Sequence, residues 1–212
     1  MRKLPVYLLL DTSGSMFGEP IEAVNNGVQV LLSTLRSDPY ALETAHLSVI
    51  TFNNSARQEV PMTELSTFQA PTLAASGCTA LGEALSLVAQ RADAEVTKTT
   101  AEKKGDWKPL VFIMTDGAPT DDLQRGLDEF KKRKWGVVVA CAAGAGASTD
   151  TLSKITECVV SLDKADSKTI SKFFKWVSAS ISTSSMKVDE GHGDVTGLGE
   201  LPPPPPEVNI VV

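Results

Sequence analysis

The chain has 212 residues, of which 42% are hydrophobic and 22% charged, and its formal net charge is −6 at pH 7. This composition predicts one globular domain and excludes a chain that is disordered throughout. The acidic balance argues against a nucleic-acid partner, because phosphate binding needs clustered positive charge. Three cysteines without a Cys-x-x-Cys pair indicate neither a disulfide framework nor a structural zinc site, so we expect a cytoplasmic protein. No apolar segment reaches the length that spans a membrane, so we expect no membrane partner.

The first predicted strand, residues 6–10, runs into an acidic and hydroxyl-rich turn. Its unbroken apolar run is typical of a strand buried on both faces of a parallel sheet. Ligands of such sheets bind outside the carboxyl ends of the strands, where Asp11, Ser13 and Ser15 would present one carboxylate and two hydroxyls. These oxygen atoms suit a cation such as Mg2+. The alternative is a turn whose serines only bond free backbone N–H groups ahead of a helix that begins near Pro20.

Helices and strands alternate along the rest of the chain. Residues 47–52 and 56–60, the latter ended by Pro61, are predicted to form an antiparallel hairpin at one edge of the sheet. The alternation predicts an α/β fold: a doubly wound, mostly parallel six-stranded sheet with one antiparallel edge strand and helices on both faces. The other predicted strands are residues 109–114, 136–141 and 158–162; the predicted helices are residues 19–36, 81–104, 148–156 and 167–181, and one more begins near residue 123.

Two further loops are predicted at the same edge of the sheet. Thr79 stands at the start of the helix predicted over residues 81–104. The alternative to a role in the site is that its hydroxyl merely caps this helix. Asp116 follows the apolar strand 109–114. Each of these signals is weak alone, but together with the turn after the first strand they predict one site formed by three loops.

The chain resembles von Willebrand factor A (vWA) domains with an intact metal-ion-dependent adhesion site (MIDAS), over residues of about 4 to 182. Within that family it is most similar to the bacterial TerY-like tellurium-resistance and stress proteins. The resemblance implies a vWA or Rossmann-like fold and a divalent cation, Mg2+ before Mn2+ or Ca2+. It implies that Ser13, Ser15 and Thr79 contact the cation through hydroxyls, and that Asp11 and Asp116 act directly or through water. The motifs that carry the resemblance are Asp11-Thr12-Ser13-Gly14-Ser15-Met16, Gly77-Cys78-Thr79-Ala80-Leu81 and Thr115-Asp116-Gly117-Ala118-Pro119-Thr120-Asp121.

The function implied by this resemblance is a metal-dependent protein–protein interaction module, a cytosolic adaptor in a bacterial tellurite-resistance or stress-response system, and not an enzyme. A cation held largely by neutral hydroxyls is undercompensated, so we expect the partner to supply an Asp or Glu. TerY-like proteins are associated with a protein kinase and a phosphatase, which are candidate partners. The alternative is a metal-dependent hydrolase or phosphotransfer-linked enzyme that uses the same site. A Ser/His/Asp triad is poorly supported, because His46 precedes a predicted strand and His192 lies in a predicted tail.

The remaining features are given structural interpretations. The domain is predicted over residues 1–182, and the Gly- and Pro-rich residues 183–212 are predicted to be a flexible tail whose apolar end could dock on a sheet edge. The glycine turn at residues 143–147 lacks the third glycine of a dinucleotide-binding loop. Cys78 is a candidate redox residue, although a small residue that fits its loop is the simpler interpretation. The basic run 131–134 is expected to be a solvated helix end.

Overall fold

The computed structural model describes residues 2–191 and 193–211, and its centre is a seven-stranded sheet in the order β3-β2-β1-β4-β5-β6-β7. Five strands are parallel, while β3 pairs antiparallel with β2 and β7 antiparallel with β6. The predicted fold class is confirmed, with seven strands instead of six and two antiparallel edges instead of one. The strands are β1 (Leu4–Asp11), β2 (Ala45–Phe52), β3 (Ala56–Glu64), β4 (Leu110–Thr115), β5 (Val138–Ala143), β6 (Val159–Leu162) and β7 (Asn209–Val211).

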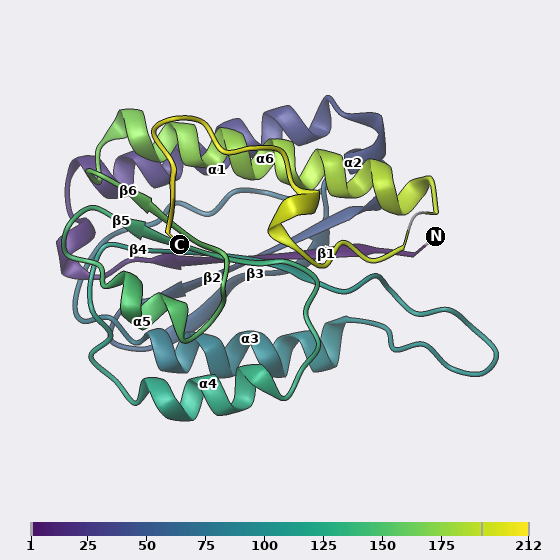
Figure 1. Cartoon of the computed structure of the whole chain (residues 1–212), viewed down its shortest axis with the longest axis horizontal. Coiled ribbons are helices and arrows are strands. Elements are labelled where there is room, and N and C mark those ends of the chain that lie inside the picture. Colours follow the sequence, from purple (N-terminus) through teal and green to yellow (C-terminus); the bar gives the residue numbers. More distant parts are fainter. Residues whose placement is uncertain (1, 192, 212) are drawn as a thin grey trace.

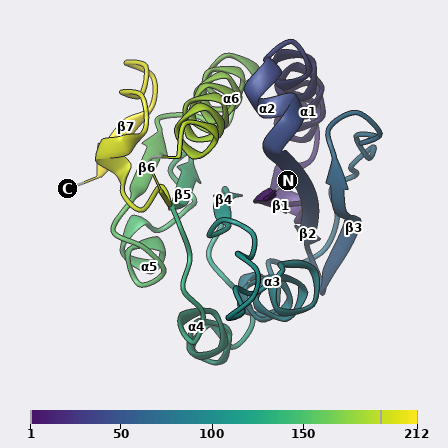
Figure 2. The same ribbon diagram turned by 90° about the vertical axis from the view of Figure 1, so that its right-hand side faces the viewer.

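Helices cover both faces of the sheet, with α1, α2 and α6 on one side and α3, α4 and α5 on the other (Figures 1 and 2). Every residue of β1 is buried, and its side chains alternate between the two cores, as the pleat of a strand requires. This explains why the strand is apolar throughout. The helices are α1 (Glu19–Arg36), α2 (Pro39–Thr44), α3 (Leu81–Glu95), α4 (Leu123–Lys131), α5 (Thr149–Ser153) and α6 (Ser167–Asp189), with short 3-10 turns η1 (Gly14–Met16) and η2 (Leu198–Glu200).

Several predicted boundaries were wrong for local reasons. Strand β3 passes through Pro61 and ends at Glu64, because an edge strand tolerates a residue without an N–H. Helix α3 ends at Glu95 and not near Lys104, since the N–H of Thr97 bonds to the Asp106 carboxylate at 2.8 Å and the chain leaves as a loop. The short helix α2, capped by Asp38, was not predicted.

The end of the domain also differs from the prediction. Helix α6 continues beyond Ile181 to Asp189, and Ser184, Ser185 and Val188 on its last turns are buried. The Ser184 hydroxyl bonds to the Ser180 carbonyl at 2.8 Å, so this side chain is buried without a distant partner. The predicted domain boundary at residue 182 therefore falls inside a helix.

The residues predicted as a separate tail lie against the domain. Val195, Leu201 and Val208 are buried, and β7 extends the sheet next to β6, as Figure 2 shows in yellow. The indole Nε1 of Trp176 on α6 donates to the Pro202 carbonyl at 2.8 Å. The segment thus follows the alternative of an edge-docked chain end, while His192 and Val212 are outside the described residues. Among the described helices, none combines the length and the apolar character that crossing a membrane requires.

Candidate metal centre

The topology brings the predicted site loops together. Strands β1 and β4 are parallel neighbours, with Leu10 opposite Met114, so both end at the same edge of the sheet. Asp11 is the last residue of β1, and Asp116 follows the last residue of β4. In Figure 1 this edge lies on the left, opposite the amino terminus. The site thus occupies the position expected for ligand binding in an α/β sheet.

Asp11 is a buried carboxylate with defined hydrogen bonds. The residue is 1% exposed, its Oδ1 accepts the Ser13 N–H at 2.7 Å and its Oδ2 accepts the Thr115 hydroxyl at 2.5 Å. Burial raises the pKa of Asp11 because desolvation penalises the charged form, and the hydrogen bonds from Ser13 and Thr115 act in the opposite direction. A nearby cation would compensate the buried charge.

The hydroxyls of the first loop connect Asp11 to Asp116. Ser13 Oγ and Ser15 Oγ lie 3.0 Å apart, and Ser15 Oγ donates to Asp116 Oδ1 at 2.6 Å. Ser13 is buried, whereas Ser15 is exposed. Four of the five predicted residues therefore form one chain of short polar contacts, which runs from the buried Asp11 to the exposed Ser15 and the half-buried Asp116.

The fifth residue, Thr79, is held close to the same loops. The Gly14 N–H donates to the Gly77 carbonyl at 2.9 Å, and the Thr79 N–H donates to the Thr120 hydroxyl at 3.0 Å. Thr79 Oγ1 lies 3.5 Å, and Ser15 Oγ 3.8 Å, from the position that a Cβ would occupy on Gly117. Both hydroxyls thus lie close to Gly117.

Helix capping does not account for these hydroxyls. The residue before α1 is Gly18, and the residue before α3 is Ala80, so neither Ser15 nor Thr79 stands at the cap position. Ser13 precedes η1 but makes no capping bond with its side chain to any described residue. In the first turn of α3, the N–H groups of Gly82 and Glu83 instead bond to the Asp121 carboxylate at 3.0 and 2.7 Å. The capping interpretations of both loops were therefore wrong.

Three supporting residues were not identified as such from the sequence. Thr115 holds Asp11, Thr120 holds the backbone of Thr79, and Asp121 caps α3. All three belong to the segment around Asp116, so the turn after β4 organises all three loops. The recurrence of Thr and Asp in this turn was visible in the sequence, but its contacts depend on the tertiary fold.

The donor set fits a hard divalent cation. The two carboxylates, Asp11 and Asp116, make no ion pair with a basic side chain anywhere in residues 2–191 and 193–211. Across the same residues, no three His, Cys, Asp or Glu side chains cluster in a way that could hold a metal ion. A cation here would thus depend on hydroxyl oxygens as well as carboxylates, which suits Mg2+ or Mn2+ better than a metal that prefers thiolates or imidazoles.

Residues 6–176 match the family model of the von Willebrand factor type A domain, and the chain belongs to this family. Members of the family commonly mediate metal-dependent protein interactions. A curated relative, the uncharacterized protein sll0103 of Synechocystis sp., is 33% identical in an alignment 123 residues long that covers 55% of this chain and 26% of that protein. The chain thus spans about a quarter of the length of this relative.

Several solved structures share the fold. A von Willebrand factor type A protein from Catenulispora acidiphila aligns with a TM-score of 0.65 at 18% identity, over 86% of this chain and 43% of that one. Proximal thread matrix protein 1 from the mussel byssus, with a zinc-occupied MIDAS motif, aligns with a TM-score of 0.60 at 17% identity, over 87% of this chain and 46% of that one. The pilus adhesin SpaC of Lactobacillus rhamnosus GG gives a TM-score of 0.69 at 14% identity, over 86% of this chain and 30% of that one. At these identities the likeness establishes the fold.

Proposed function

We propose that this domain is a metal-dependent protein-interaction module without catalytic activity, and that Asp11, Ser13, Ser15, Thr79 and Asp116 hold a divalent cation, Mg2+ in the cell. The observation that carries the proposal is the continuous set of polar contacts from Asp11 through Ser13 and Ser15 to Asp116, whose two carboxylates pair with no basic side chain among the described residues. A bound cation would supply a positive charge at an otherwise acidic edge of the sheet. Membership of the vWA family supports this assignment.

The partner is proposed to present an Asp or Glu side chain to the cation. Asp11 and Asp116 would repel such a group in the metal-free protein, whereas the cation attracts it and offsets its desolvation. Next to the site, Phe17 is 79% exposed, two residues after Ser15. An exposed aromatic side chain beside a charged site is typical of an interaction surface. We therefore expect the acidic residue of the partner to be accompanied by an apolar one.

The cellular setting is proposed from the sequence resemblance. We propose a TerY-like adaptor in the bacterial cytosol that acts in tellurite resistance or stress response and binds an associated protein kinase or phosphatase. The competing proposal is a metal-dependent hydrolase or phosphotransfer-linked enzyme. A serine nucleophile is disfavoured because His46 lies at the start of β2, opposite Pro5, about 20 Å along the strands from Asp11.

Affinity capture from host extract tests the proposal. The immobilised protein is compared in Mg2+, in chelator, and as the Thr79→Ala variant in Mg2+, with Thr100→Ala, an exposed residue of the 96–109 loop, as the matched control. We expect proteins that are retained by wild type and Thr100→Ala in Mg2+ and are lost in the other two conditions. The same retained proteins under all conditions would mean that partners use a different surface.

A further inference from the structure

A second site lies at the opposite end of the sheet from the metal centre. A pocket of about 570 Å3 is bordered by the segments that follow α3, precede β4 and end α4. Its apolar wall includes Ala89, Val96 and Pro109. This volume falls within the range of about 300 to 1,000 Å3 that is typical of small-molecule sites.

The lining of this pocket is positive although the chain is acidic. Six basic and four acidic side chains line it, a formal excess of two positive charges in a chain with a net charge of −6. Two segments, the loop after α3 and the end of α4, contribute five of the six basic residues. The basic residues are Arg2, Lys98, Lys108, Lys132, Arg133 and Lys134.

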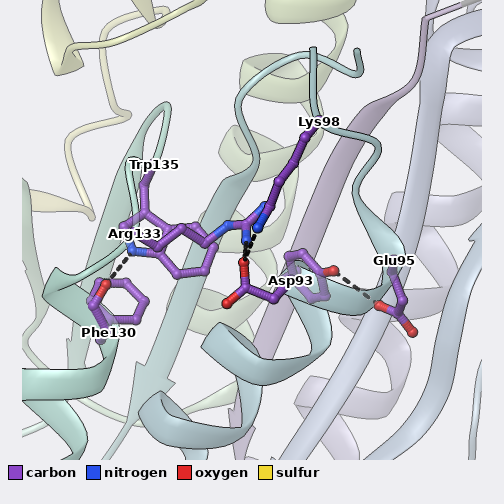
Figure 3. A network of polar contacts seen from close by, with 7 residues as sticks. Asp93, Glu95, Lys98, Phe130, Arg133 and Trp135 are labelled. Carbon is purple, nitrogen blue, oxygen red and sulfur yellow. Dashed lines mark hydrogen bonds and ion pairs between the residues drawn. The ribbon is translucent and has the colours of Figure 1, made fainter. Parts of the chain in front are cut away.

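The acidic residues of the pocket are already engaged. Asp106 accepts the backbone N–H groups of Lys3 and Thr97 at 3.0 and 2.8 Å. Glu129 pairs with Lys132 at 2.6 Å, and Asp194 pairs with Lys108 at 3.3 Å. The fourth acidic residue, Asp93, forms ion pairs through one carboxylate oxygen with Arg133 at 2.6 Å and with Lys98 at 3.2 Å, as Figure 3 shows. One carboxylate oxygen therefore serves two cations.

Arg133 is a largely buried cation of the pocket. Its side chain is 12% exposed, and its guanidinium lies 5.6 Å from the centre of the Trp135 ring. Trp135 is itself fixed, because it stacks on Phe130 at 4.6 Å and donates to the Phe130 carbonyl at 2.9 Å (Figure 3). The buried Nε of Arg133 has no hydrogen-bond partner in the described part of the chain. A guanidinium held in place by Asp93 and Trp135 is preorganised to bind an anion.

From this geometry we propose that the pocket binds a small organic phosphate of nucleotide size. A phosphate monoester carries a charge of about −1.5 to −2 at pH 7, which matches the excess of two positive charges. The phosphate lies among Lys98, Arg133 and Lys134, where the exposed Lys134 makes no ion pair with any described residue. The organic part lies on the apolar wall. The site is independent of the cation at the other edge of the sheet.

Calorimetric titration with AMP in chelator and low salt tests this site, since the chelator prevents a cation elsewhere from holding the phosphate. The test variant is Lys98→Gln with Lys134→Gln, and the matched control is Lys154→Gln with Lys175→Gln, two exposed lysines outside the pocket. We expect the wild type and the control to bind AMP alike, and the pocket variant to bind at least about tenfold more weakly at an unchanged melting temperature.

Adenosine, which lacks the phosphate, is expected to bind far more weakly than AMP. The proposal is overturned if the wild type does not bind AMP, if the pocket variant binds it as tightly as the control, or if adenosine binds as tightly as AMP.

Discussion

The Thr115 hydroxyl donates a hydrogen bond of 2.5 Å to Asp11 Oδ2, and this contact joins the ends of β1 and β4 across 104 residues of sequence. Asp11 is thereby held between Thr115 and the Ser13 N–H, with one bond to each carboxylate oxygen. The carboxylate is oriented before any cation binds. Thr115 is therefore a positioning residue of the proposed metal site.

Replacing Thr115 by valine removes this bond with little change in volume. We expect Mg2+ affinity to fall about 10- to 100-fold, the usual effect of losing a residue that orients a metal ligand. Thr115→Ser, which keeps the hydroxyl, should retain most of the affinity. Equal Mg2+ affinity in Thr115→Val and wild type by calorimetry would mean that this contact does not orient the site.

Helices α1 and α6 pack closely at Gly27, so we expect a larger side chain at this position to destabilise the domain. A Cβ added to Gly27 would overlap the ring of Phe174, which is itself buried. We expect Gly27→Ala to destabilise the fold by about 1–3 kcal/mol, because overpacking displaces a core side chain. Gly199→Ala is the control, since nothing lies within 4 Å of an added Cβ there. Urea unfolding that shows equal midpoints for both variants would contradict the packing described.

The residues after α6 should contribute to stability. Asp in place of Val208, which is 3% exposed, should lower the melting temperature by about 5 °C or more, because it places a charge in the contact beneath β7. Asp in place of Ile210, which is 45% exposed, should have little effect. Removal of everything after Asp189 should lower the melting temperature at least as far as the Val208 variant does. A truncated chain as stable as the wild type would show that the segment is a free tail.

Asp166 should stabilise α6 in a pH-dependent manner. Its carboxylate caps the helix by accepting the Thr169 N–H at 2.9 Å, and this bond lowers the pKa of Asp166. A carboxyl whose pKa is lowered by folding stabilises the protein above its unfolded pKa and loses this effect as the pH falls through the folded pKa.

The substitution Asp166→Ala should thus lower the free energy of unfolding by about 1 kcal/mol at pH 7. This difference from wild type should disappear as the pH falls below the ordinary pKa of an Asp side chain, near 3.9. The control is Asp150→Ala, in the first turn of α5 but not at its cap position. Thermal melts across pH that show a constant difference for Asp166→Ala would refute a role for its charge.

The predictable part of the site is the part that depends on strand ends. Asp11, Ser13, Ser15 and Asp116 follow apolar strands directly, and parallel strands bring their carboxyl ends to one edge. The role of Thr115 in orienting Asp11 could not be predicted in the same way, because the contact depends on the register of β1 and β4. The same holds for Asp121, which caps a helix from a loop 39 residues away.

The end of the fold was less predictable because its sequence is polar or short. Ser180 and Ser184 are buried on α6, and their hydroxyls bond to carbonyls of their own helix. A serine-rich sequence therefore did not mean that this part of the chain is exposed to solvent. Strand β7 has three residues and gains its structure from the edge of β6; its apolar sequence allowed for such docking but did not identify β6 as the partner. Local propensity is weak where a distant partner decides the structure.

The most direct test of the proposed metal site is a calorimetric titration of Mg2+ and Mn2+ into wild type, Asp11→Asn and the control Asp150→Asn. Asparagine preserves the shape of the buried Asp11 side chain, so all three proteins should melt at similar temperatures in chelator. We expect one ion per chain in the wild type and the control, and loss of binding in Asp11→Asn. Unchanged affinity for both ions in a folded Asp11→Asn protein would contradict the assignment of the cation to this site.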